Sequence, residues 1–288
     1  MIGITGASGA LGRATAEAVL RTVDPRRVVL TTRRPETLAD LADRGAHVRA
    51  ADFDDVRGLT AAFEGVGRLL LVSTDNVGAR LEQHRAAIAG AAAAGVAHVV
   101  YTSVPEPVPG NPAAVVLDHA GTERALRESG LRWTMLRNHL YAHLQVSAVA
   151  HAAASGRLVT NHGTGAAAYV TREDCAAAAA AVLTQDGHED RVFDVSGPEA
   201  VTAGDLVALA REIGGREVEL VAVDDETFAE GLRAAGVPEL DVRLITSFGA
   251  STRGGYLAGV SGAFSDLTGR APTPFAEAVR TALPRRGA

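Results

Sequence analysis

The chain begins Met1-Ile2-Gly3-Ile4 and continues Thr5-Gly6-Ala7-Ser8-Gly9-Ala10-Leu11-Gly12, so a short apolar run leads directly into glycines spaced three residues apart. A helical pattern of apolar residues follows at once. A strand, a glycine-rich turn and a helix in this order are typical of the first βαβ unit of a dinucleotide-binding domain. In such a unit Gly6 permits the tight turn, Gly9 lets the backbone approach a pyrophosphate, and Gly12 lets the helix pack closely on the strand. Amide groups at the start of the helix then face the negative charge.

The residue that selects the nucleotide is expected at the end of the second strand. That strand, residues 27–32, ends at Arg33-Arg34, roughly 20 residues after Gly12. An acidic residue at this distance binds the ribose 2′-hydroxyl of NAD, whereas a guanidinium suits the 2′-phosphate of NADP. The sequence therefore predicts NADP(H) as the cofactor, with NAD(H) as the alternative because Arg33 can serve both.

The composition excludes several classes of protein. Of 288 residues, 47% are hydrophobic and 22% are charged, which suits one large globular domain or a domain with a smaller lobe. The net charge of −6 and the lack of a long basic run argue against nucleic acid or an acidic membrane as partner. No apolar stretch is long enough to cross a membrane, and the first strand leaves no room for a signal peptide, so we expect a cytoplasmic protein.

Cysteine and lysine usage narrows the chemistry further. Cys175 is the single cysteine, so an intrachain disulfide and a cysteine-based zinc cluster are excluded, and no metal is expected. All 28 Lys/Arg residues are arginine. The chain therefore has no Schiff-base amine, no P-loop lysine, and no Tyr-x-x-x-Lys pair of the kind that typical short-chain dehydrogenases use. A guanidinium stays charged and cannot replace a titratable amine.

Strand and helix patterns alternate through the first half of the chain. We expect strands at residues 2–4, 27–32, 47–51, 68–73, 98–103 and 132–136, separated by helices at 13–23, 35–44, 55–64, 77–94 and 113–130. The near-continuous apolar runs among these strands favour burial on both faces of a parallel sheet.

Beyond residue 137 the pattern is less regular. It predicts helices at residues 140–155 and 173–183, a strand at 191–195 that returns to the sheet, and further helices near 203–213, 224–235 and 273–283. The fold class is therefore α/β, with a Rossmann-type doubly wound parallel sheet and a smaller C-terminal α/β substrate lobe. We expect the NADP-binding domain at residues 1–137, with its sheet completed by about 190–197, and the lobe mainly at 138–288.

Ligands of open α/β sheets lie beyond the carboxyl ends of the strands. The predicted cofactor contacts are the residues that follow the strands: Gly6, Ala7, Ser8, Gly9, Ala10, Leu11, Arg33, Asp52, Phe53, Ser73, Thr74, Asp75, Arg137 and Asn138. We expect the adenine near Asp52 and Phe53 and the ribose near Arg33. The nicotinamide is then expected toward Ser73, Ser103 and residues 137–139.

Further short motifs recur in order along the chain: Arg33-x-Pro35, Ala51-Asp52, Leu69-Leu70-Leu71-Val72-Ser73, Val77-Gly78, Gln83-His84-Arg85, Tyr101-Thr102-Ser103, Leu136-Arg137-Asn138, Thr171-Arg172-x-Asp174 and Gly249-Ala250-Ser251. Together with the glycine-rich turn they resemble the NmrA-like atypical short-chain dehydrogenases, most closely the bacterial NADPH:quinone oxidoreductase 2 type, over nearly the whole chain. The resemblance implies NADPH in the crevice and two-electron reduction of quinones. It also implies cofactor contacts at residues 6–11, 33, 73–75 and 137–142.

The sequence departs from these relatives beside the expected nicotinamide. They tend to read Arg-Asn-Gly-Trp-Tyr followed by an Asn, whereas this chain has Arg137-Asn138-His139-Leu140-Tyr141, with Leu144 in the Asn position. The family also lacks the Tyr-x-x-x-Lys pair, and His119-x-x-x-Glu123 stands at that place here. These differences leave the cofactor site intact and the identity of the substrate open.

Tyr141 and His139 are the candidate catalytic residues, and Tyr141, His143 and Tyr169 are the candidate substrate contacts. Tyr141 either hydrogen-bonds a quinone oxygen or caps the loop after the sixth strand. For His139 and His143, proton donation near neutral pH competes with a structural role.

The pair His119 and Glu123 lies four residues apart on one helix face, and we favour a pair on the helix surface over a substitute catalytic dyad. Arg137 is expected to anchor a carboxylate such as Glu123. Cys175 is expected to be an inert core thiol.

The missing dyad favours electron-poor conjugated acceptors. Hydride addition to a quinone gives a delocalised phenolate that water can protonate, whereas a simple ketone gives an alkoxide that needs a general acid. The predicted function is therefore NADPH-dependent hydride transfer to a quinone or similar acceptor. The alternatives are a non-catalytic NADP(H)-sensing NmrA-like regulator and a biosynthetic reductase of an aromatic polyketide. The expected partner is a small quinone-like molecule, with a homodimer left open.

Overall fold

A computed structural model describes residues 1–283. Its centre is one seven-stranded sheet in the order β3-β2-β1-β4-β5-β6-β9, in which every neighbouring pair is parallel. The strands are β1 (Ile2–Ile4), β2 (Val28–Thr32), β3 (His47–Ala50), β4 (Arg68–Leu71), β5 (His98–Ser103), β6 (Arg132–Asn138) and β9 (Arg191–Val195). The order reverses between β1 and β4, which confirms the predicted doubly wound Rossmann-type sheet.

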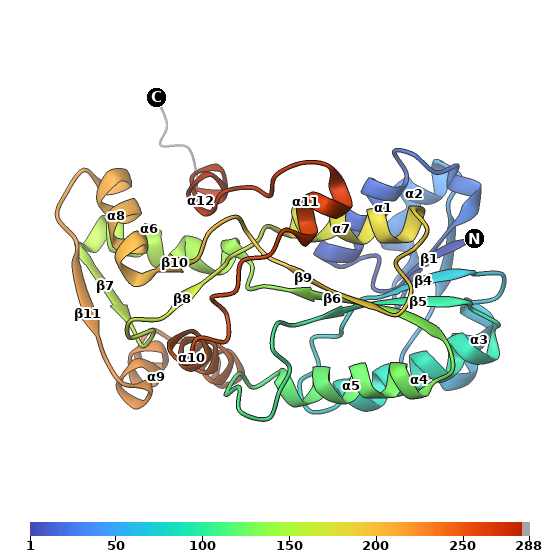
Figure 1. The fold of residues 1–288 in the computed structure, drawn as a ribbon, viewed down its shortest axis with the longest axis horizontal. Helices are drawn as coiled ribbons and strands as arrows, with labels where there is room; N and C mark the ends of the chain where they lie inside the picture. Colours follow the sequence, from blue (N-terminus) through green and yellow to red (C-terminus); the bar gives the residue numbers. More distant parts are fainter. Residues whose placement is uncertain (284–288) are drawn as a thin grey trace.

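Helices cover both faces of this sheet (Figure 1). One face carries α1 (Ala10–Val19), α2 (Ala39–Asp43), α7 (Arg172–Thr184) and α11 (Ala263–Thr268), and the other carries α3 (Val56–Ala62), α4 (Arg80–Ala93) and α5 (Val116–Glu128). Because both faces are covered, all residues of β2 and β5 are buried. This burial explains why these strands appear in the sequence as continuous runs rather than as alternating patterns.

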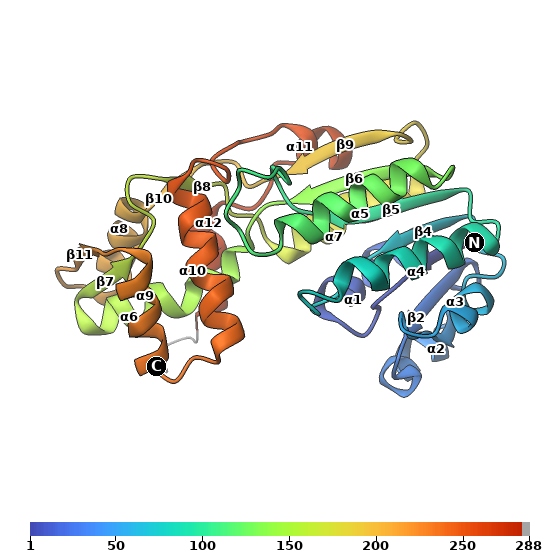
Figure 2. The ribbon, with the colours of Figure 1, turned by 90° about the horizontal axis from the view of Figure 1, so that it is seen from below.

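A smaller lobe lies beyond the carboxyl end of β6, at the left of Figure 2. It contains α6 (Val146–Ser155), α8 (Ala203–Gly214), α9 (Asp225–Ala234), α10 (Glu239–Arg253) and α12 (Phe275–Ala282). Two small sheets complete it: β7 (Arg157–Thr160) pairs with β11 (Glu219–Ala222), and β8 (Ala166–Ala167) pairs with β10 (Val201–Thr202). The lobe has an apolar core of its own, as the predicted C-terminal α/β lobe requires. Within residues 1–283, no helix has the length and apolar character needed to cross a membrane.

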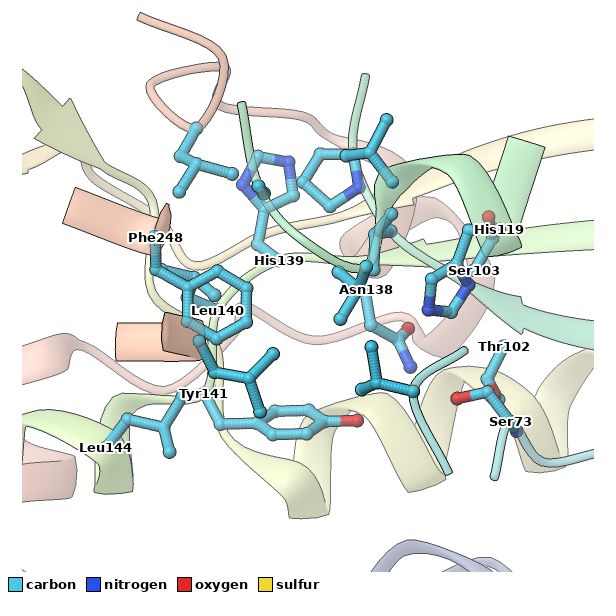
Figure 3. A pocket seen from close by; sticks show the side chains of 18 of the residues that line it. Ser73, Thr102, Ser103, His119, Asn138, His139, Leu140, Tyr141, Leu144 and Phe248 are labelled. Carbon is cyan, nitrogen blue, oxygen red and sulfur yellow. The ribbon is translucent and has the colours of Figure 1, made fainter. Parts of the chain in front are cut away.

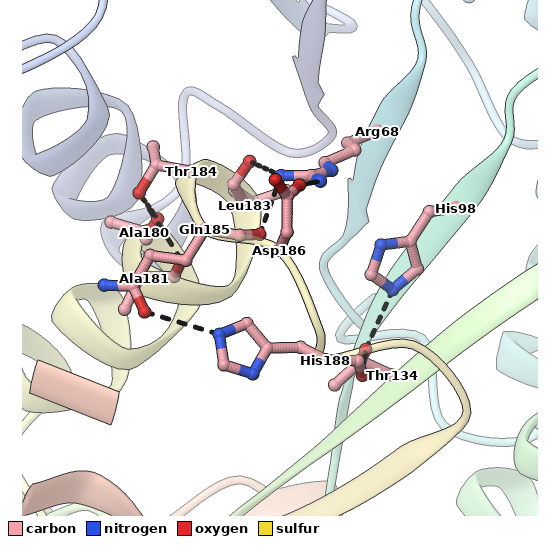
Figure 4. A network of polar contacts seen from close by, with 10 residues as sticks. All are labelled: Arg68, His98, Thr134, Ala180, Ala181, Leu183, Thr184, Gln185, Asp186 and His188. Atoms are coloured by element: carbon pink, nitrogen blue, oxygen red, sulfur yellow. Dashed lines mark hydrogen bonds and ion pairs between the residues drawn. The ribbon is translucent and has the colours of Figure 1, made fainter. Parts of the chain in front are cut away.

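Polar contacts fasten α7 and β9 to the amino ends of the strands, away from the glycine-rich turn (Figure 4). Arg68 donates to the carbonyl oxygens of Leu183 and Gln185 at the end of α7, at 3.2 and 2.8 Å. Next to β9, Thr134 donates to the carbonyl oxygen of His188 and receives a hydrogen bond from His98. The second half of the chain thereby supports the sheet formed by the first half.

Several predicted boundaries were wrong. The helix expected at residues 140–155 begins only at Val146, after a 3₁₀ turn at Ala142–Gln145. The reason is tertiary: the backbone of Leu140 and Ala142 hydrogen-bonds to Val170, which keeps this stretch extended. The helix expected at 77–94 begins at Arg80, because Gly78 has a φ of +94° that no helix accepts.

Other elements were missed or divided. The segment 35–44 forms a 3₁₀ turn, Pro35–Leu38, followed by α2 rather than one helix. The sequence pattern was too weak to predict α10, α11 or the four short strands of the lobe.

Candidate active site

Two adjoining cavities lie at the carboxyl ends of the strands. The larger, of about 640 Å³, runs along the glycine-rich turn, and we call it the nucleotide cleft. Its lining includes most of the predicted cofactor contacts: Gly6, Ser8, Gly9, Ala10, Leu11, Arg33, Asp52, Phe53, Ser73, Thr74 and Asp75. The structure thus brings together residues from the ends of four neighbouring strands.

The glycine-rich turn has the geometry of a phosphate cradle. Gly6 has a φ of +57°, a left-handed conformation that favours glycine. A Cβ on Gly12 would lie 2.3 Å from the carbonyl oxygen of Gly6, so only glycine permits this approach of α1 to the turn. Gly9 stands directly before α1 and has no side chain to cap it, and Arg13 is the first residue whose amide donates to the Gly9 carbonyl oxygen. The amides of residues 10–12 are therefore available to an anionic ligand.

Arg33 lies at the rim of the nucleotide cleft and is exposed. Among the described residues, no carboxylate lies within 4.0 Å of its guanidinium. The neighbouring loop is fixed because Thr32 and Ser8 share a 2.7 Å hydroxyl contact, and Thr32 also receives the amide of Arg34. The arrangement presents an unpaired cation, which fits a ligand with a phosphate at this rim.

The second cavity, of about 430 Å³, lies between the sheet and the lobe, and we call it the lobe cavity (Figure 3). Its walls are mostly apolar and come from the loop after β5, from the segment after β6, from α10 and from the turn after α10. They include Val104, Pro105, Leu140, Leu144, Leu240, Leu244, Phe248 and Leu257. Ser73, Asp75 and Tyr141 line both cavities, so the two spaces meet at these residues.

Tyr141 stands where the cavities meet, with its hydroxyl directed toward the interior of the lobe cavity (Figure 3). Burial raises the pKa of this phenol, so it remains protonated at neutral pH and can donate a hydrogen bond. The Arg172 guanidinium carbon lies 5.6 Å from the ring centroid, and His143 stacks on the ring at 5.6 Å. These contacts hold the ring in place.

Asn138 and His139 are both buried and both line the lobe cavity. In Figure 3 the Asn138 amide lies above the Tyr141 hydroxyl. Burial lowers the pKa of His139 to about 4 against the opposing effect of its hydrogen bond to Leu257. Its imidazole is therefore neutral near pH 7 and does not serve there as an imidazolium acid.

A family model described as NAD(P)H-binding matches residues 6–186, which span the glycine-rich turn, Arg33 and α7. The chain belongs to this NAD(P)H-binding family. It is 37% identical to quinone oxidoreductase 2 of Escherichia coli over 281 residues, which cover 97% of each chain.

Solved structures agree with this assignment. The NADPH complex of the Escherichia coli NADPH-dependent quinone oxidoreductase 2 superimposes with a TM-score of 0.94 at 35% identity, covering 98% of this chain and 99% of that one. The NADP(H) complex of triphenylmethane reductase from Citrobacter sp. gives 0.93 at 31% identity, covering 98% and 100%. The resemblance derived from the sequence motifs is confirmed.

Four predicted site residues do not reach either cavity. The Arg137 side chain binds Glu123 through two 3.0 Å hydrogen bonds, which confirms the expected anchor and turns its guanidinium away from the nucleotide cleft. Tyr169 lies in the lobe core against Phe275, with ring centroids 5.0 Å apart. The side chain of Ala7 is buried in the core that contains residues of α1 and α7. His143 stacks on the ring of Tyr141.

The expected surface pair of His119 and Glu123 was wrong, because both side chains are buried and they bind different partners. Glu123 accepts hydrogen bonds from Ser103 and Arg127 as well as from Arg137. Burial works to raise the pKa of Glu123, but these hydrogen bonds outweigh it and hold the pKa below its ordinary value. His119 instead lines the lobe cavity, and its Nδ1 lies 2.7 Å from the Tyr101 hydroxyl.

Sequence reasoning missed the part that α4 plays between the cavities. Arg80 donates to the Thr74 carbonyl at 2.6 Å, His84 Nε2 accepts the Thr74 amide at 3.2 Å, and the Thr74 hydroxyl donates to Gln83 at 3.0 Å. All three polar atoms of Thr74 are therefore held by one turn of helix, which fixes the wall that carries Ser73 and Asp75. The motif Gln83-His84-Arg85 was recognised in the sequence, but its contact with Thr74 could not be predicted from it.

Arg172, from the motif Thr171-Arg172-x-Asp174, was not among the predicted site residues, yet it lines the nucleotide cleft together with Tyr141. Cys175 is buried, and burial raises the pKa of its thiol, in keeping with an inert core residue. Residues 1–283 hold no group of three or more His, Cys, Asp or Glu side chains placed to bind a metal ion.

Proposed function

We propose that this protein is an NADPH-dependent oxidoreductase that transfers hydride to a quinone. The observation that carries the proposal is the meeting of the two cavities at Ser73, Asp75 and Tyr141. A dinucleotide that follows the cleft from Arg33 past the glycine-rich turn ends at these residues, beside the lobe cavity. When bound there, the reduced nicotinamide supplies a hydride to a molecule on the other side of the junction.

The cleft favours NADPH over NADH. The amides of residues 10–12 would hold the pyrophosphate, and the unpaired guanidinium of Arg33 would bind the 2′-phosphate. Asp52 and Phe53 lie at the end of the cleft where the adenine is expected. The solved relative from Escherichia coli was described in complex with NADPH, which is consistent with this choice.

The lobe cavity suits a flat, largely apolar acceptor. Leucine and phenylalanine side chains from α10 and the segment after β6 would exclude water, and the protonated Tyr141 hydroxyl would donate to a quinone oxygen. The chain has no lysine, so the Tyr-x-x-x-Lys pair that protonates the substrate oxygen in typical short-chain dehydrogenases is missing. A quinone depends on such a proton donor less than a simple ketone does. The name of the Escherichia coli relative, quinone oxidoreductase 2, agrees with this substrate class.

We also propose that the partner of this protein is a small quinone-like molecule rather than nucleic acid. Its proposed location is the cytoplasm. The net charge of −6 and the single, buried cysteine support both statements. A homodimer stays a prediction from the sequence.

The proposal is tested by following NADPH oxidation with a panel of quinones and a matched panel of simple ketones. We expect turnover with quinones and little with ketones. Tyr141→Phe should lower kcat/KM for quinones about tenfold, the loss of one hydrogen bond, while Tyr256→Phe, outside both cavities, should not. Faster reduction of ketones, or tight NADPH binding without turnover of any acceptor, would contradict the proposal.

A further inference from the structure

Few charged side chains are buried in the described part of this protein. Among residues 1–283, the Arg, Asp and Glu side chains that are buried are Arg80, Glu123 and Asp174, with 6%, 2% and 1% of their surface exposed. Glu123 is paired with two arginines at 3.0 Å, and Asp174 is paired with Arg270 at 2.7 Å. Two of the three charges are therefore neutralised inside the fold.

Arg80 is the exception. Its guanidinium donates to the Thr74 carbonyl and contacts Nε2 of His119 at 3.4 Å. Both partners are uncharged, because burial lowers the pKa of His119 far below the neutral range. Within the described residues, no carboxylate comes within 4.0 Å of this guanidinium.

An uncompensated buried charge is costly, and folded proteins usually pair it or expose it. Arg80 does neither: it lines the lobe cavity, where the acceptor is proposed to bind, and the two carboxylates that also line this cavity, Asp75 and Asp241, do not come within 4.0 Å of its guanidinium. Its position is fixed from two sides, since Thr74 and His119 hold it and the Tyr101 hydroxyl in turn contacts His119. A preorganised cation on the wall of a mostly apolar cavity has the properties of an anion-binding group.

The proposed reaction produces an anion in this cavity. A quinone that takes up hydride gains two electrons and one proton and becomes the hydroquinone monoanion, while the nucleotide is oxidised. A proton from water then completes the hydroquinone. The negative charge thus develops on the substrate oxygen before any proton arrives.

We propose that Arg80 is a catalytic residue whose guanidinium binds the oxygen that becomes negatively charged as hydride reaches the quinone. This role rests on the proposed function. The guanidinium remains protonated throughout, so it stabilises charge and is not the proton source. Removing one preorganised donor of this kind lowers turnover by about 100-fold.

Two kinds of substrate distinguish charge stabilisation by Arg80 from a purely structural role in holding Thr74. A quinone becomes negative when it accepts hydride, whereas a cationic triphenylmethane dye becomes neutral. Arg80 therefore helps the first reaction and gives no help to the second. A residue that only positions Thr74 would affect both reactions alike.

The experiment compares Arg80→Gln and Arg80→Lys with the wild type, using NADPH with a benzoquinone and with a cationic triphenylmethane dye. Arg80→Gln should lower kcat/KM for the quinone about 100-fold more than for the dye, whose own loss measures only the support of Thr74, and Arg80→Lys should recover part of that difference. Arg85→Gln is the matched control, because Arg85 lies on the same helix, is exposed and pairs with the exposed Glu82. An equal loss with both acceptors overturns the proposal.

A binding measurement decides the matter without turnover. 4-Nitrophenol is titrated against the NADP⁺-loaded protein, and the absorbance of its phenolate reports its charge. The wild type should favour the phenolate, lowering the apparent pKa of bound nitrophenol by about one unit relative to Arg80→Gln. Equal values in the two proteins would refute the anion site. If the wild type binds the phenolate preferentially but reduces no quinone, the proposed function is wrong, whereas the proposed anion site is supported.

Discussion

The nucleotide cleft and the lobe cavity meet at three residues but are built in different ways. Much of the cleft comes from one continuous turn, residues 6–12, which offers backbone amides and requires glycine at set places. The lobe cavity is assembled from side chains of separate segments, including α10, which is more than 150 residues from β4. A site formed by backbone depends on local sequence, whereas a site formed by side chains depends on how distant elements pack.

The electrostatics of the two spaces differ as well. The cleft presents an exposed guanidinium and amide groups, which retain contact with water until a ligand arrives. Against the lobe cavity the fold buries neutral histidines and the unpaired Arg80. Changes in the cleft should therefore weaken cofactor binding, and changes around the lobe cavity should alter chemistry and acid stability.

Gly12→Ala is expected to have the largest effect. The new Cβ would lie 2.3 Å from the Gly6 carbonyl oxygen, and because both groups belong to the backbone, the turn must move away from α1. We expect the free energy of unfolding to fall by about 3 kcal/mol and NADPH to bind at least about 100-fold more weakly. Urea unfolding and calorimetric titration with NADPH measure the two effects.

The same substitution in the lobe provides the control. Gly231 lies inside α9 with nothing within 4 Å of the position its Cβ would take. Gly231→Ala should stabilise the protein by about 0.5–1 kcal/mol and leave NADPH binding unchanged. If both variants lost cofactor affinity equally, the close approach at Gly12 would not be the cause.

Arg33→Ser tests the exposed cation of the cleft. Loss of a charge-assisted contact to the 2′-phosphate should weaken NADPH binding by about 10–100-fold. NADH has no phosphate there, so its affinity should stay within about twofold of the wild type. Calorimetric titration with both nucleotides checks the difference, and a parallel loss for NADH would mean that Arg33 acts on the shape of the loop.

The sequence was sufficient for the cleft because local rules determine it. The spacing of Gly6, Gly9 and Gly12 after a short strand predicted the turn, and Arg33 followed at the expected distance. Parallel strands then placed Asp52 and Ser73 beside them, because all strands end at the same edge. None of these inferences needed knowledge of the lobe.

The lobe cavity could not be predicted in the same way. Its wall from α10 was missed altogether, and the segment after β6 was predicted to be a helix although Val170 holds it extended. His119 and Glu123 share a helix face, as predicted, but whether that face meets solvent depends on α4 and β6 packing against it. Tyr169 was assigned to the substrate from its place in the sequence, whereas packing against Phe275 puts it in the core.

The smallest expected effect is on stability in acid. It comes from His84, which supports Thr74 in the wall between the two cavities. His84 is fully buried, and its Nε2 must stay unprotonated to accept the Thr74 amide. Burial and the charge of Arg80 lower its pKa from 6.5 to about 3. Between these values the unfolded chain binds a proton that the folded chain does not, so the free energy of unfolding rises with pH and levels off above about 6.5.

For this one histidine the slope should be about 1.4 kcal/mol per pH unit. Urea unfolding of the wild type and of His84→Asn across about pH 4 to 5.5, between the two pKa values, isolates this slope, because the other buried histidines contribute equally to both proteins. The slope of the variant should be smaller by that amount. Equal slopes would mean that His84 does not stay neutral in the folded protein, and the wall between the two cavities would then need another support.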